Sequence, residues 1–136
     1  MNKMKAQIVF EQVLLFIIAV AIFLSTYSFF NMYQGSFSLR MRDVYIDLIG
    51  ERIVLEIIRL CKANDTNITV ITQVPDKILG KVYTISLSKD QLKINVSGYE
   101  KEYKLYGFEN FEFGGSVRSS GKTILIYKKG NSIILK

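Results

Sequence analysis

The hydrophobic residues of this chain begin as one continuous block. Twelve apolar residues follow one another from Val13 to Leu24, and no charged residue lies between Glu11 and Arg40. The 21 uncharged residues over 13–33 come close to the ~20 that a helix needs to cross a bilayer. We therefore expect a hydrophobic membrane or assembly helix over 7–34.

Past this block the apolar residues recur with the 3.6-residue period of a helix that buries one face. The main apolar row consists of Ile46, Ile49, Ile53, Ile57 and Leu60, and Val44, Leu48, Leu55 and Ile58 are expected to widen it. The pattern predicts an amphipathic helix over 35–63. No proline interrupts residues 8–63, so one helix of about 55 residues can cover both stretches. Gly35 is its weakest point and the expected place for a bend or local melting. Gly50 is expected to allow close approach of a strand or helix.

The pattern then becomes an alternation with period two, which predicts a β-rich head domain over 64–136. Apolar residues alternate with polar ones on both sides of a turn at 88–90, which is typical of a hairpin over 83–97. Further strands are expected at Ile68–Val74, Tyr103–Tyr106, Phe111–Phe113, Lys122–Tyr127 and Ser132–Leu135. A helix followed by a run of antiparallel strands indicates an α+β fold, with the amphipathic helix packed on a C-terminal antiparallel sheet.

The amino-acid composition excludes several kinds of catalytic and metal-binding site. The 136 residues carry a net charge of +6, no histidine and one cysteine, Cys61. A disulfide within the chain, a His/Cys metal cluster and histidine-assisted nucleophilic catalysis are therefore excluded. The basic residues are spaced along alternating strands, which is typical of a solvated face, so no nucleic-acid partner is expected. Gly121-Lys122-Thr123 lacks the first glycine of a phosphate loop and precedes a strand-like run. We expect no catalytic residue, no cofactor and no metal.

The N-terminus admits three interpretations. A secretory signal peptide requires a small-residue cleavage site of the A-x-A kind after the apolar block, and no A-x-A motif occurs there. An uncleaved signal anchor agrees with Lys3 and Lys5 on the cytoplasmic side. It leaves Glu11, a costly carboxylate near the start of a lipid-compatible segment, without an explanation.

The third interpretation explains this carboxylate. The segment Lys5-Ala6-Gln7-Ile8-Val9-Phe10-Glu11 resembles the class III, prepilin-type signal peptide of archaeal type IV pilin-like proteins. The resemblance implies a leader over 1–6, cleavage by a prepilin peptidase between Ala6 and Gln7, and glutamate as the fifth mature residue. Val9 stands where the family often has a small polar residue.

This resemblance implies a function in assembly. The chain would be a major or minor pilin of an archaeal type IV pilus-like filament on the cell surface, and adhesion is one function that this resemblance implies. Its partners would be identical or related pilin subunits, the prepilin peptidase, and the membrane before assembly. Glu11 would pair with the Gln7 amine of a neighbouring subunit in the helix bundle. The alternative is an uncleaved, signal-anchored extracytoplasmic β domain that acts as a stationary component of an archaeal motility or secretion machine.

Three N-x-[ST] triplets are candidate N-glycosylation sites, at Asn64, Asn67 and Asn95. Asn64 and Asn67 are expected in an accessible turn, and Asn95 on the polar side of its strand. Ordinary turn and strand asparagines are an equally good interpretation of each site singly.

Overall fold

The computed structural model describes residues 2–136, with side chains from Ala6 onward. Met1 and the side chains of Asn2–Lys5, which belong to the predicted leader, lie outside the described residues. The elements are α1 (Asn2–Lys62), β1 (Asn67–Gln73), β2 (Tyr83–Ser88), β3 (Gln91–Val96), β4 (Tyr99–Lys104), β5 (Glu112–Arg118), a 3-10 turn η1 (Ser119–Gly121), β6 (Thr123–Lys129) and β7 (Ser132–Leu135). They form two compact units, the N-terminal unit up to Arg40 and the C-terminal unit Met41–Lys136.

α1 begins earlier than the apolar pattern indicates and includes residues 2–6. Its backbone stays helical through Gly35, so the local melting expected there does not occur. Neither proline nor a second glycine lies nearby, and the flanking residues are compatible with a helix. The helix ends at Lys62, ahead of the predicted turn residues.

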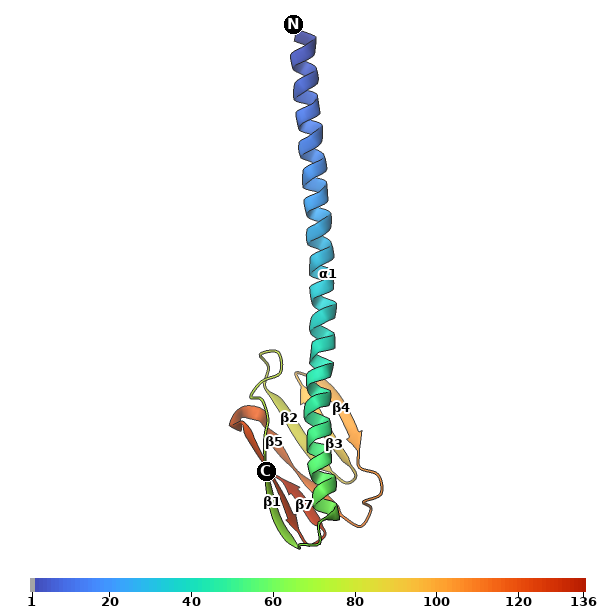
Figure 1. Cartoon of the computed structure of the whole chain (residues 1–136), viewed down its shortest axis with the longest axis vertical. Helices are drawn as coiled ribbons and strands as arrows, with labels where there is room; N and C mark the ends of the chain where they lie inside the picture. The colour runs from blue at the N-terminus through green and yellow to red at the C-terminus, as the bar shows by residue number, and fades with distance from the viewer. Residues whose placement is uncertain (1) are drawn as a thin grey trace. The chain divides into compact units, whose positions relative to one another are not determined.

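The C-terminal unit contains a seven-stranded sheet in the order β1-β6-β7-β5-β2-β3-β4 (Figure 1). The predicted hairpin is confirmed as β2 and β3, with Ile85 opposite Ile94. The expectation of antiparallel pairing holds for every pair but one: β5 and β7 are parallel, with Phe113 opposite Ile133. Two predicted strands are wrong in extent, because β4 covers Tyr99–Lys104 instead of 103–106 and β5 continues from Glu112 to Arg118.

One hydrophobic core joins α1 to the sheet, which confirms the predicted α+β fold. The main apolar row of the helix is buried, with Ile46, Ile53 and Ile57 fully inaccessible. From the sheet the core receives every second residue of β2 and β3, as well as Ile124, Ile126, Ile133 and Leu135. The apolar periodicity therefore identifies the helix face that covers the sheet.

Candidate functional site

The apolar side chains of the N-terminal unit are exposed throughout. Between Ile8 and Leu39, twenty large apolar residues each have about two fifths or more of their surface accessible: Ile8, Val9, Phe10, Val13, Leu14, Leu15, Phe16, Ile17, Ile18, Val20, Ile22, Phe23, Leu24, Tyr27, Phe29, Phe30, Met32, Tyr33, Phe37 and Leu39. Among the described residues, α1 has the length and composition of a helix that can cross a membrane. A surface this apolar requires lipid or protein to cover it.

Polar side chains within this surface bond to their own helix. The hydroxyls of Ser25 and Thr26 donate to the carbonyls of Ala21 and Ile22, at 2.8 and 2.9 Å. Ser36 donates to Met32 in the same way, at 3.2 Å. Each hydroxyl thus has a partner without water, and these residues do not prevent the helix from lying in lipid or in a dry bundle.

Glu11 is different, because its side chain is an ionisable carboxyl group and lies on the same exposed apolar surface. Among the described side chains its contact is the Gln7 amide, whose Nε2 lies 3.5 Å from Oε1. A bond of that length to a neutral amide is weak and does not neutralise the carboxylate. Ala6 and Gln7, the predicted cleavage pair, are exposed one turn away on the same helix.

The helix also exposes apolar residues within the C-terminal unit. Val44, Leu48 and Leu55, which were expected to widen the buried row, are 52, 60 and 56 % exposed. That expectation is wrong, because the sheet covers the side of the helix that carries Ile46, Ile53 and Ile57. We call Val44, Leu48 and Leu55 the outward row. Sequence periodicity did not separate it from the core, since both rows are apolar.

The start of the helix in the C-terminal unit is fixed to β4 by polar contacts. The Lys101 ammonium and the Tyr103 hydroxyl both bond to Oδ1 of Asp47, at 2.6 and 2.7 Å. Lys101, and after it Tyr103, hold the pKa of Asp47 below its ordinary 3.8. The guanidinium of Arg42 lies 3.9 Å from the centroid of the Tyr99 ring. These contacts hold the outward row in a fixed orientation relative to the sheet.

The candidate glycosylation sites differ in their surroundings. Asn64 lies exposed in the turn after α1, and Asn67 is the exposed first residue of β1. Asn95 is half-buried, and its Oδ1 accepts the Gly98 N–H at 3.1 Å, so this side chain already holds the β3–β4 turn. Asn64 and Asn67 follow shortly after the end of α1 in the chain, whereas Asn95 lies within β3, just before the β3–β4 turn.

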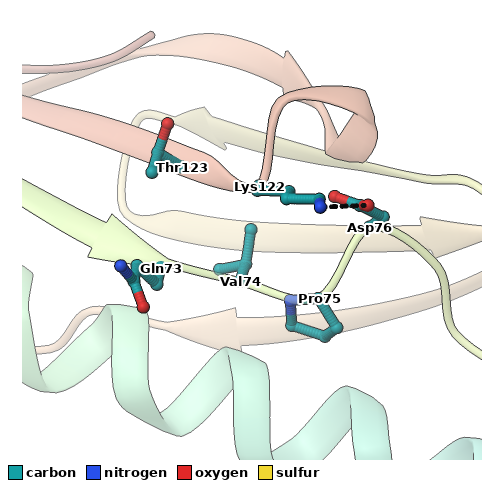
Figure 2. A pocket seen from close by; sticks show the side chains of 6 residues that line it. All are labelled: Gln73, Val74, Pro75, Asp76, Lys122 and Thr123. Atoms are coloured by element: carbon teal, nitrogen blue, oxygen red, sulfur yellow. Dashed lines mark ion pairs between the residues drawn. The ribbon is translucent and has the colours of Figure 1, made fainter.

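A shallow hollow lies where β1 ends and β6 begins (Figure 2). It contains two charged residues, Asp76 and Lys122. Nζ of Lys122 lies 3.8 Å from Oδ2 of Asp76. Behind it the Ser119 hydroxyl donates to the Asp76 carbonyl at 2.7 Å, and the Tyr83 hydroxyl donates to the Pro75 carbonyl at 2.6 Å. Burial, and after it the Asp76 charge, raises the pKa of Tyr83 to about 12. These bonds anchor a loop, whereas Oδ1 of Asp76 is buried without a hydrogen-bond partner.

Across residues 2–136, no group of three or more His, Cys, Asp or Glu side chains has a geometry that could hold a metal ion. Comparison of the chain with protein-family models, with curated proteins and with solved structures finds no match. The features of the molecule that call for a partner are therefore the exposed helix surface, its single carboxylate and the outward row.

Proposed function

We propose that this chain is a structural subunit, major or minor, of an archaeal type IV pilus-like filament that assembles through its N-terminal helix. The proposal rests on two observations. The N-terminal segment resembles a prepilin-type signal peptide, and the apolar surface of α1 is exposed. The precursor would lie in the cell membrane, and the mature subunit would enter an extracellular filament.

The extent of that surface is the observation that carries the proposal. The hydrocarbon core of a bilayer covers ~20 residues of a helix. Exposed large apolar residues of α1 run from Ile8 to Leu55, well beyond that length, and the last of them belong to the C-terminal unit. Lipid therefore accounts for part of the surface, and in the proposed filament a neighbouring protein would cover the outward row. Neighbouring copies of the same helix would supply an apolar surface of the same kind.

The bundle also gives Glu11 a partner. Cleavage between Ala6 and Gln7 creates an α-amino group with an ordinary pKa near ~8, which is a cation at neutral pH. Away from lipid and water, a carboxylate without a counter-ion costs several kcal/mol, so pairing with the amine of a neighbour is strongly favoured. The four-residue offset between Gln7 and Glu11 would then set the axial register between subunits.

The second candidate is a signal-anchored β domain that is never cleaved and acts as a stationary component of a motility or secretion machine. It is favoured by Lys3 and Lys5 ahead of the apolar block. The two functions differ in the fate of the leader and in whether the chain leaves the membrane.

N-terminal sequencing and intact-mass measurement of native protein, from membranes and from sheared filaments, test the proposal. The filament fraction is expected to begin at Gln7, with a modified terminus allowed, and a mass excess beyond that modification reports glycans at Asn64, Asn67 or Asn95. A start at Met1 or Asn2 in assembled protein would contradict the filament function.

Leu55→Lys, on the outward row, should reduce incorporation into filaments. Tyr106→Lys, at a loop position 78 % exposed, is the matched control and should not.

A further inference from the structure

β1 forms one of the two edges of the sheet. Along its whole length, from Asn67 opposite Lys129 to Gln73 opposite Thr123, it pairs with β6. Within residues 2–136, no backbone hydrogen bond from another segment reaches its other side. The outer edge therefore presents a row of N–H and C=O groups that water or another strand must satisfy.

The two edges of the sheet are not equally protected. β4, at the opposite edge, carries Glu100, Lys101, Glu102 and Lys104, which is the charge pattern that prevents an edge strand from pairing with other chains. β1 has the sequence Asn-Ile-Thr-Val-Ile-Thr-Gln, without a charge, a proline or a glycine, and five of its seven residues are β-branched. By this physical criterion the edge of β1 is open to a second strand.

The sequence of β1 is nearly complementary to itself. When two copies are set antiparallel about Val70, Asn67 lies opposite Gln73 of the second copy, and Thr69 lies opposite Ile71. Ile68 then lies opposite Thr72, and Val70 opposite itself. Each amide thus meets an amide and each β-branched residue meets a β-branched residue, which are favourable cross-strand pairs, and no like charges meet.

The outer face of the sheet, on the side away from α1, adds an apolar contact in the same register. Ile71 is 65 % exposed and lies opposite Leu125 of β6, and Thr69 lies opposite Tyr127. Tyr127 in turn lies opposite Ile134 of β7, which is 42 % exposed. Joining two β1 strands would place Ile71 of each copy between Leu125 of its own sheet and Thr69 of the other, so the two exposed apolar patches would become continuous.

We infer that β1 is a docking edge for a second copy of this chain, bound antiparallel about Val70 so that the two sheets become one. The contact is separate from the helix bundle of the proposed filament and does not depend on it. Its two-fold axis is perpendicular to the sheet. β1 runs back from the Lys62 end of α1 (Figure 1), so this axis sets the Met41 ends of the two helices at opposite ends of the joined sheet. Such a contact suits copies on two facing surfaces better than neighbours in one membrane.

Disulfide cross-linking of the full chain in detergent tests the register. All variants carry Cys61→Ala and are produced in a bacterial host without N-glycosylation. In the proposed contact, Asn67→Cys plus Gln73→Cys in one chain sets each new thiol opposite one of the second copy, at a spacing that a disulfide can bridge. Each single variant leaves like thiols about 20 Å apart. Mild oxidation is expected to give severalfold more covalent dimer from the double variant than from either single one.

A second substitution tests the apolar contact. Ile71→Lys in the double-cysteine chain places a cation in the joined patch and is expected to remove most of the dimer. Tyr106→Lys, the matched exposed substitution, is expected to leave it unchanged, and equal thermal midpoints show that both chains fold. The inference is overturned if the double variant cross-links no more than the single variants, or if Ile71→Lys dimerises as well as its parent.

Discussion

The ring of Tyr103 lies directly on Gly50 of α1, in the space that a side chain at position 50 would occupy. The Tyr103 hydroxyl also donates to Asp47, one turn earlier on the helix, at 2.7 Å. The close approach expected of Gly50 is thus made by an aromatic residue of β4, an edge strand. The absence of a Cβ lets the helix and the strand meet and lets the phenol reach the carboxylate.

Gly50→Ala tests this packing. Alanine favours an isolated helix by ~1 kcal/mol over glycine. Here its methyl group would overlap the Tyr103 ring, and overpacking costs about 1–3 kcal/mol. We expect a lower thermal midpoint for the variant, and Tyr103→Ala in the same chain should make the Gly50→Ala change stabilising. A rise in midpoint for Gly50→Ala alone would show that the ring moves aside without cost. The four chains of this cycle are compared by thermal unfolding.

The ion pair beside this contact predicts a pH dependence. The folded-state pKa of Asp47 is lowered, so its contribution to stability is complete above about pH 4 and is lost as the pH falls through the folded-state value. The pKa of Lys101 is raised by Asp47, so its contribution is complete up to about pH 10 and is lost above that. Asp47→Asn should lower the midpoint at pH 6 and have little effect at pH 2. Asp65→Asn, in the exposed turn, is the control and should show no such difference.

The strands that sequence predicted well are those with one clean apolar face. Tyr83, Ile85 and Leu87 alternate with polar residues, and all three are buried. The extent of β4 was missed because Glu100, Lys101 and Glu102 resemble a charged loop, whereas charge is what an edge strand tolerates. β5 was cut short by Gly114 and Gly115, and a Cβ at Gly115 would collide with the backbone of Leu135. The parallel pairing of β5 with β7 depends on tertiary contacts that no local pattern records.

For the helix, the sequence identified the apolar residues but not which of them the sheet covers. Ile53 and Leu55 look alike in a helical pattern, and only the position of the sheet buries the first and exposes the second. Glu11 was evident from sequence, because a single carboxylate in an apolar block is costly wherever it lies. The free edge of β1 depends on the strand order, so it was not predictable from sequence.

Ile53→Asp and Leu55→Asp form a matched pair that separates the two helix faces. Ile53 is fully buried, so an aspartate there should destabilise the C-terminal unit by several kcal/mol. Leu55 is 56 % exposed, so the same change should shift the free energy of unfolding by less than about 0.5 kcal/mol. Chemical denaturation of both full chains in detergent provides the measurement. Equal losses would mean that a partner chain also buries Leu55 under those conditions.

The end of α1 depends on a buried lysine of β6. Lys128 is 7 % exposed, and its ammonium donates to the Ala63 carbonyl at 2.5 Å, where the helix leaves its last carbonyls unpaired. A cation is favourable at this end of the helix dipole. Lys128→Met keeps the side-chain length and removes the donor, so the unpaired carbonyl should cost about 1–3 kcal/mol of stability. Lys129→Met, on the exposed neighbour, should cost little, and a similar loss from both variants would argue against the cap.

Glu11 provides the sharpest test of assembly, because its substitution barely changes shape. Glu11→Gln should leave leader cleavage and membrane insertion intact, since a neutral amide is easier to place in lipid than a carboxylate. Incorporation into filaments should fall sharply, because the Gln7 amine of the neighbour would lose its counter-ion in a dry bundle. Glu11→Asp keeps the charge with a shorter reach and should be intermediate.

The measurement compares the membrane-bound pool with the sheared filament fraction for all three chains. If Glu11→Gln enters filaments as well as the parent, the pairing is wrong. If even the parent chain is never found in filaments, the anchored-domain function is favoured. In that case neither the leader nor Glu11 would have a role in filament assembly.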